Sequence, residues 1–360
     1  MKTLPLHNLH HELGAKMGPF AGFQMPLTYK GVKAEHLCVR EHVGVFDVSH
    51  MGEFIVSGDN ALSFLQHTTS NNVAALSIGD AQYGYIPNDK GGVVDDLLIY
   101  RLEEETFMLV VNASNLEKDW NWLNNKNQSF GALLKNESEN FALLAVQGPK
   151  AHALIHKLSS VNLAEQKPFT IQSATVANAE NVWVATTGYT GAGGVELYVP
   201  VSNVVQVWKA LIREGGAHNI QPIGLAARDT LRLEMGYCLY GHELSEETSP
   251  ISARLSWCTD FSKSFVGDSI IKDQKHKGTP QARIGFTMIE RGIPRQGYTL
   301  TTEDGAPIGE VSSGTSSPSL GVGIGMGYID RDYSTVGTEI YVLIRDKNIK
   351  ASVVHLPFIS

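Results

Sequence analysis

Two adjacent carboxylates interrupt the apolar stretch GGVVDDLLIY, residues 91–100. Successive side chains of a β-strand point to opposite faces, so Asp95 and Asp96 cannot both perform the same task. One carboxylate can cap or pair near the turn over residues 88–92, while the other enters a cavity beside Leu98 and Tyr100. In the alternative interpretation both are solvated where the strand leaves its turn, and the pattern favours neither.

A third carboxylate, Glu196, lies within the segment GYTGAGGVELYVP, residues 188–200. If it is buried it needs a hydrogen-bonding partner, and a ligand with fixed N–H donors, such as the guanidine-like edge of a pterin, would serve. The pattern alone favours an exposed residue on an amphipathic strand. The glycines before Glu196 are a poor match to a phosphate-binding loop, because a strand follows them instead of a helix.

Two arginines lie four residues apart in GLAARDTLRLEMG, residues 224–236. On one helical face, Arg228 and Arg232 repel each other unless acids or an anionic ligand balance their charges. The alternative is an ordinary surface pair between Asp229 and Arg232. The spacing alone leaves both interpretations open.

Composition and charge argue against several classes of partner. The 360 residues carry a formal net charge of −8 and show no dense Lys/Arg cluster, so nucleic acid is not an expected partner. The three cysteines have no CxxC spacing and indicate free thiols in a reducing compartment. His10 and His11 lack the spacing of a helical zinc site, so no metal is expected. The segment GVGIGMG, residues 321–327, is rejected as a dinucleotide loop because it lies among short strands.

The chain is also not expected to associate with a membrane. Its N-terminal segment has neither the apolar core of a secretory signal nor the Arg-rich character of a transit peptide. No window reaches the length of about 18 apolar residues that a membrane-spanning helix needs. These features predict a cytoplasmic protein.

Helices and strands are mixed along the chain without strict alternation, which predicts an α+β fold with antiparallel sheets. Periodicity predicts six helices, over residues 31–44, 59–70, 113–123, 148–158, 204–216 and 224–236. After about residue 275 the pattern changes to short strands separated by turns, which predicts a small β-barrel or sandwich. The polar run 272–281 between these regions is interpreted as a linker or a domain boundary.

Several motifs occur together in one order along the chain. They are FAGFQMPLTY, VGVFDVSHMGEFIVSG, GGVVDDLL, LLAVQGP, GYTGAGGVEL, GLAARDTLRLEMGYCLYG and SSGTSSPSLGVGIGMGYI. From about residue 4 to the C-terminus the chain resembles the T-protein family of the glycine cleavage system, the tetrahydrofolate-dependent aminomethyltransferases.

This resemblance implies a three-domain cloverleaf around a central folate-binding hole. The domain boundaries expected from it are 1–50 for the first part of domain 1, 51–138 for domain 2, 139–272 for the remainder of domain 1, and 273–360 for a C-terminal β-barrel. The implied reaction transfers the one-carbon unit of aminomethyl-lipoyl H-protein to tetrahydrofolate. Its products are 5,10-methylenetetrahydrofolate, ammonia and dihydrolipoyl H-protein.

The resemblance also implies roles for particular residues. The family's catalytic aspartate is the second of the Asp-Asp pair, here Asp96. Glu196 and Arg228 match the residues that bind the pterin of tetrahydrofolate. Further expected positions are the folate-pocket residues Tyr83, Asn112 and Tyr189, and the cavity-mouth residue Arg295 near the substrate and partner.

This sequence departs from the family pattern in two places. It lacks the tyrosine that reaches folate near the C-terminus of some relatives, and Ala192 and Gly193 replace an acidic pair that is common in the GYTG loop. Two other functions are considered beside aminomethyl transfer. One is a tetrahydrofolate-dependent demethylase of a small methylated compound, and the other is a non-catalytic folate-binding assembly factor. The absence of the assembly factor's Lys-Gly-Cys motif argues against the latter.

Overall fold

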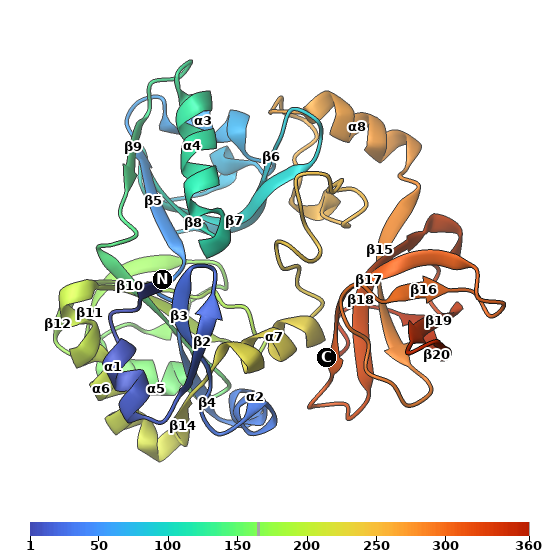
Figure 1. Cartoon of the computed structure of the whole chain (residues 1–360). Coiled ribbons are helices and arrows are strands. Elements are labelled where there is room, and N and C mark those ends of the chain that lie inside the picture. Colours follow the sequence, from blue (N-terminus) through green and yellow to red (C-terminus); the bar gives the residue numbers. More distant parts are fainter. Residues whose placement is uncertain (164–165, 360) are drawn as a thin grey trace. The chain divides into compact units, whose positions relative to one another are not determined.

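The computed structural model describes residues 1–163 and 166–359 (Figure 1). The chain forms two compact units. The first unit comprises Met1–Gln66, Asn72–Gly84 and Leu97–Asp229, and the second comprises His67–Asn71, Tyr85–Asp96 and Thr230–Ser360. Within the described residues, no helix has the length and apolar character needed to cross a membrane.

A six-stranded sheet forms the centre of the first unit. Its order is β11 (Ile171–Val176), β12 (Ala179–Ala185), β13 (Gly194–Pro200), β10 (Phe141–Gln147), β4 (Val43–Asp47) and β14 (Ile220–Pro222). All neighbours are antiparallel except β4 and β14. Helices α1 (His7–Glu12), α5 (Ala151–Leu158) and α6 (Val204–Gly215) contribute Leu154, Trp208 and Leu211 among others to its apolar core.

Two smaller sheets accompany the central one. The five-stranded sheet has the order β6 (Ala81–Pro87), β7 (Val93–Glu103), β8 (Thr106–Val111), β5 (Gly52–Ser57) and β9 (Leu133–Asn136). The three-stranded sheet has the order β1 (Lys2–Thr3), β3 (Phe23–Thr28) and β2 (Lys16–Phe20). The other helices that begin in the first unit are α2 (Val32–Glu41), α3 (Ala61–Thr68), α4 (Leu116–Asn127) and α7 (Leu225–Glu234).

The C-terminal part of the second unit is a closed six-stranded barrel. Its strands follow the order β15 (Gln281–Met288), β18 (Gly323–Asp330), β17 (Pro307–Ser316), β16 (Thr299–Thr301), β19 (Glu339–Ile344) and β20 (Lys347–Val354). Closure leaves no unpaired sheet edge, and inward-pointing side chains such as Phe286, Leu300 and Val342 fill the interior. Helix α8 (Asp268–Lys277) precedes the barrel.

Short 3-10 helices occur between the main elements. They are η1 (Val73–Ala75), η2 (Ala113–Asn115), η4 (Val201–Asn203), η5 (Gly216–His218), η6 (Ser256–Cys258) and η7 (Arg331–Tyr333).

The predicted α+β class and the C-terminal barrel are confirmed, and each of the six predicted helices is present. Residues 272–281 are not a linker without secondary structure, because α8 extends through Lys277 and β15 begins at Gln281. The alternative, a domain boundary within this run, remains a prediction. Ile271 is the buried residue of that helix, so the sequence offers almost no apolar periodicity to detect. The three-domain division remains a prediction.

Candidate functional site

Strand β13 places Glu196 inside the first unit. The residues paired with Glu196 on the neighbouring strands are Ala145 and Ala185, whose small side chains leave room beside the carboxylate. Glu196 is only 9% exposed, so the expectation of an exposed residue on an amphipathic strand is wrong. The interior of a sheet is a costly place for a carboxylate unless hydrogen bonds or charges compensate it.

A chain of hydroxyl groups leads to Glu196. Thr187 Oγ1 donates to Glu196 Oε2 at 2.5 Å, and the Tyr100 hydroxyl lies 2.8 Å from Thr187 Oγ1. The Tyr198 hydroxyl lies 3.0 Å from that of Tyr100. Each hydroxyl has one proton to donate, so with Glu196 ionised the donors run from Tyr198 through Tyr100 and Thr187 to the carboxylate. Burial raises the pKa of both tyrosines, which keeps these hydroxyls protonated.

Arg228 is the cation of this region. Burial raises the pKa of Glu196, while the Thr187 hydrogen bond and the charge of Arg228 act in the opposite direction. The guanidinium carbon of Arg228 lies 4.3 Å from the centre of the Tyr189 ring, within the range of a cation–π contact. Glu196, Arg228 and Tyr189, three of the predicted site residues, are therefore close together.

The position of Arg228 depends on the start of α7. A Cβ atom on Gly224 would lie 2.2 Å from the carbonyl oxygen of Leu27, so only glycine permits this approach. The Gly224 N–H donates to Glu35 Oε2 at 2.7 Å, and Glu35 Oε1 accepts from the N–H groups of Tyr29 and Gly31. A buried carboxylate thus joins the entry to α7 with the segment after β3.

Two further buried groups, His50 and Glu53, were not predicted as site residues. Burial raises the pKa of Glu53 well above its ordinary value, and the nearby charge of Glu196 raises it further. Burial and then Arg228 lower the pKa of His50 to about 3, so its imidazole is neutral. Glu53 Oε2 and His50 Nδ1 have no hydrogen-bond partner among the described residues. The detectable signal for Glu53 was a lone carboxylate in the apolar segment GEFIVSG, the same signal that marked Glu196.

Asp95 and Asp96 lie on β7 in the second unit. They are 0% and 9% exposed respectively, so the interpretation that both are solvated is wrong. The preceding turn is held by Asn88 Oδ1, which accepts from two backbone N–H groups, those of Lys90 and Gly92. Burial raises the pKa of Cys238 to about 12, and Asp96 is one of the negative charges that contribute. Asp96 is therefore a buried charge within range of this thiol.

The other predicted residues are more accessible. Tyr83 on β6 and Asn112, which follows β8, are partly buried in the first unit. Arg295 is exposed in the second unit and donates to the carbonyl oxygen of Gly314 at 3.4 Å. The functional roles of Tyr83, Asn112 and Arg295 remain predictions.

The fold and these buried groups define a two-unit α+β protein with a C-terminal barrel and a compensated carboxylate inside a sheet. Residues 6–263 match the family model described as the GCVT N-terminal domain, and residues 282–359 match the glycine cleavage T-protein C-terminal barrel domain. The chain belongs to the glycine cleavage T-protein family. GVGIGMG, rejected above as a dinucleotide loop, contributes to strand β18 of the barrel.

Full-length relatives support this assignment. The chain is 54% identical to an aminomethyltransferase of Bacteroides fragilis and 48% identical to one of Flavobacterium psychrophilum, with 99% of each chain covered in both comparisons. A crystal structure of the glycine cleavage system aminomethyltransferase T from Bartonella henselae superposes with a TM-score of 0.93. That structure is 36% identical, and the match covers 99% of this chain and 98% of that one.

Proposed function

We propose that the chain is the aminomethyltransferase of a glycine cleavage system, with tetrahydrofolate as acceptor and a lipoylated H-protein as donor. The aminomethyltransferase activity follows from family membership and from relatives that match over their full length. The reaction replaces the C–S and C–N bonds of the one-carbon unit with bonds to two folate nitrogens, and releases ammonia and a lipoyl thiol.

Tetrahydrofolate fits the donors and acceptors found in the first unit. The observation that carries the proposal is the buried carboxylate Glu196, which lies near Arg228. Its charge also reaches Glu53, whose Oε2 has no partner among the described residues. A carboxylate can accept two parallel N–H bonds from the amino-pyrimidinone edge of a pterin. Glu196 would bind and orient that edge, and Arg228 would hold the carboxylate ionised. Tyr189, stacked on Arg228, would fix the direction of the guanidinium.

Asp96 is assigned the catalytic role. When bound, tetrahydrofolate supplies the nucleophilic nitrogen that receives the one-carbon unit. A buried carboxylate can orient that amine, take up or pass on its proton, and stabilise positive charge at the one-carbon centre as ammonia leaves. Its low exposure strengthens such electrostatic effects, because less water is available to screen the charge.

The test is the formation of methylenetetrahydrofolate and ammonia from aminomethylated H-protein and tetrahydrofolate. Asp96→Asn should lower the rate by about two to four orders of magnitude, which is the usual contribution of one positioned acid–base or electrostatic group. Asp89→Asn is the matched control, since Asp89 is an exposed acid in the turn before the same strand. Equimolar products from the wild type and the control, with little from Asp96→Asn, would support the proposal.

Other outcomes redirect the assignment. If the wild type binds tetrahydrofolate yet forms neither product, the aminomethyl donor is wrong and demethylation of a small methylated compound becomes the better hypothesis. If Asp96→Asn is fully active, Asp96 is not the catalytic carboxylate, whatever the substrate.

A further inference from the structure

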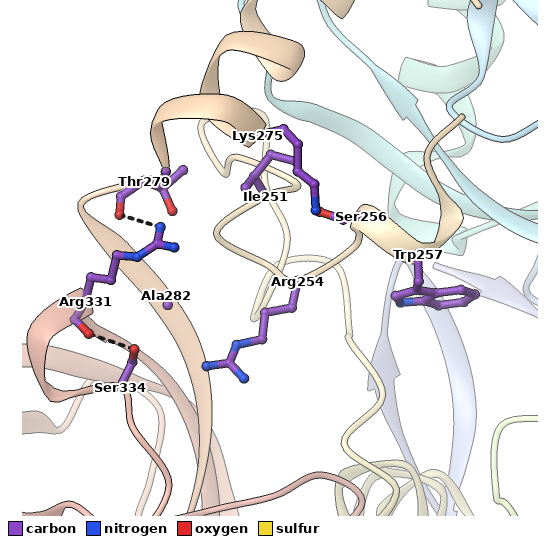
Figure 2. A pocket seen from close by; sticks show the side chains of 10 residues that line it. Ile251, Arg254, Ser256, Trp257, Lys275, Thr279, Ala282, Arg331 and Ser334 are labelled. Atoms are coloured by element: carbon purple, nitrogen blue, oxygen red, sulfur yellow. Dashed lines mark hydrogen bonds between the residues drawn. The ribbon is translucent and has the colours of Figure 1, made fainter. Parts of the chain in front are cut away.

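A pocket of about 440 Å³ lies within the second unit, apart from the residues assigned above (Figure 2). Its walls come from the loop that leads into η6, from the C-terminal half of α8, and from β15 and η7 of the barrel. Each of these three segments supplies one cation: Arg254 from the loop, Lys275 from α8 and Arg331 from η7. No aspartate or glutamate is among the lining residues.

The three cations are not balanced by neighbouring carboxylates. Among residues 1–163 and 166–359, none of the ion pairs involves Arg254, Lys275 or Arg331. Burial lowers the pKa of Arg254, and the positive charges of Arg283 and Arg331 lower it further. Like charges that face a shared space repel each other unless an anion lies between them. The pocket therefore carries uncompensated positive charge, which a bound anion would neutralise.

The surroundings hold Arg331 in place. Its Nη1 donates to the carbonyl oxygen of Thr279 at 3.4 Å, and the Ser334 hydroxyl donates to the Arg331 carbonyl oxygen at 2.7 Å (Figure 2). A Cβ atom on Gly278 would lie 2.5 Å from Nη1, so the glycine makes room for the guanidinium. The Arg331 side chain is thus positioned by contacts that leave its charge uncompensated.

Arg254 occupies a strained backbone position. Its φ of 60° lies in the left-handed region, which residues with a Cβ rarely adopt. The turn is closed by the Arg254 N–H, which donates to Ile251 O at 3.1 Å, and the Leu255 N–H, which donates to Pro250 O at 2.8 Å. Strained residues of this kind concentrate at ligand-binding and catalytic positions, where the surrounding structure maintains them.

The pocket also offers an apolar surface and hydroxyl groups. Trp257 is one of the residues that line the pocket and is 69% exposed. Ser256 and Ser334 also line it. An exposed indole beside cations suits a ligand that has a carbon skeleton between its charged groups.

We propose that this pocket binds a small organic polyanion with at least two carboxylate or phosphate groups. Two sources share this chemistry. One is the γ-linked glutamate chain that cellular folates carry, and this source rests on the proposed function. The other is a phosphorylated metabolite, which would bind whether or not folate is the acceptor.

Calorimetry on the full chain tests the pocket directly, with tri-γ-glutamate and pyrophosphate as separate probes at low ionic strength. Saturable binding of one probe per chain is expected. Arg254→Gln and Arg331→Gln should each weaken that binding by about tenfold or more, the effect of losing one charge-assisted hydrogen bond. Arg254→Lys, which keeps the charge, should retain most of the affinity and also shows whether the strained turn still folds.

Arg345→Gln is the matched control. Arg345 is an exposed arginine of the barrel with a φ of 48°, so it shares the charge and the left-handed backbone of Arg254 but lies outside the pocket. Its substitution should leave the binding of both probes unchanged. No saturable binding of either probe would overturn the proposal. So would an equal loss of affinity in Arg345→Gln and Arg254→Gln, because that result indicates a nonspecific charge effect.

The two sources separate when folates are compared. If tetrahydrofolate triglutamate binds more tightly than the monoglutamate, and Arg254→Gln removes the difference, the ligand is the glutamate chain. Binding of pyrophosphate without any preference between these folates indicates a phosphorylated ligand. A third result is that tetrahydrofolate monoglutamate and triglutamate bind with equal affinity and pyrophosphate does not bind. The pocket then has no polyanion ligand and this inference fails, while the proposed function stands.

Discussion

Each unit buries a charged constellation, but the two are satisfied to different extents. In the second unit, Arg232 Nη1 donates to Glu243 Oε2 at 2.9 Å and to the Tyr237 carbonyl oxygen at 3.1 Å, and Nη2 donates to Ser313 Oγ at 2.8 Å. Glu243 also accepts from the Leu239 N–H at 3.0 Å and from the Ser312 hydroxyl at 2.5 Å. Both side chains are almost completely buried, and each oxygen of the carboxylate has a donor.

The group around Glu196 in the first unit is less complete. Glu53 Oε2 and His50 Nδ1 have no partner within the described part of the chain, and after burial the charge of Glu196 further raises the pKa of Glu53. A saturated buried pair maintains structure, whereas unsatisfied polar atoms are free to bind a ligand. This difference separates the two regions more clearly than burial does.

The largest expected effect comes from breaking the saturated pair. Arg232→Met should lower the free energy of unfolding by about 3–5 kcal/mol, because it leaves the Glu243 charge buried without its partner. Urea denaturation measures the loss. Arg213→Met, which removes an arginine 72% exposed at its side chain, is the control and should change stability by less than about 0.5 kcal/mol. Equal stabilities of the two variants would show that the buried Arg232–Glu243 pair contributes no more than an exposed arginine.

In contrast to Arg232→Met, Glu196→Gln should change the free energy of unfolding little but should clearly weaken ligand binding. An amide cannot accept two N–H bonds as the carboxylate does, so tetrahydrofolate binding should weaken by about 1.5–3 kcal/mol, roughly tenfold to a hundredfold. Binding titrations measure this effect beside Glu180→Gln, an exposed glutamate on the neighbouring strand β12. If the variant is strongly destabilised but binds folate as tightly as the wild type, Glu196 stabilises the fold, as the Arg232–Glu243 pair does, and does not bind the ligand.

The pH dependence of stability should reveal Glu53. Its pKa in the folded chain lies well above the ordinary value of 4.5, so the folded state keeps a proton that the unfolded state has lost. The stability is therefore fully present below pH 4.5 and decreases as the pH rises toward the folded pKa, by about 1.4 kcal/mol for each pH unit in that window. Glu53→Gln should flatten this decrease, whereas Glu105→Gln, at an exposed position, should preserve it. An unchanged slope in Glu53→Gln would show that another group titrates.

The smallest effect is expected at the end of the hydroxyl chain. Tyr198→Phe removes the donor to Tyr100 and should cost about 1 kcal/mol of stability or of folate binding. Tyr298→Phe is the control, because the Tyr298 hydroxyl makes no hydrogen bond with the described residues. Differential scanning calorimetry and binding titrations on both variants would show which property the hydroxyl chain supports. If Tyr198→Phe and Tyr298→Phe have equal stability and equal folate affinity, the hydroxyl chain contributes to neither property.

Local pattern was sufficient to single out the Asp-Asp pair of β7 and Glu196, but not to decide the environment of either. Both stand out as carboxylates in apolar strands, yet the same pattern allowed solvated residues. Glu53 carried the same signal in GEFIVSG and was passed over, since nothing in the sequence indicates that β5 places it near Glu196. Helix α8 was missed because its sequence gives too weak a signal. Its residues are mainly polar, so they show little of the apolar periodicity that identifies a helix.

The sequence by itself determined the six predicted helices, the change to barrel strands after residue 275 and, through ordered motifs, the family. These features depend on neighbours along the chain, on periodicity and on turn residues, which are readable without a fold. Only the tertiary structure decided which buried charges are satisfied. Glu196 depends on a hydroxyl chain from Tyr100 and Tyr198, 98 positions apart, and Arg232 bonds to Ser313, 81 positions away. Such partners meet only when the strands and helices that carry them have packed.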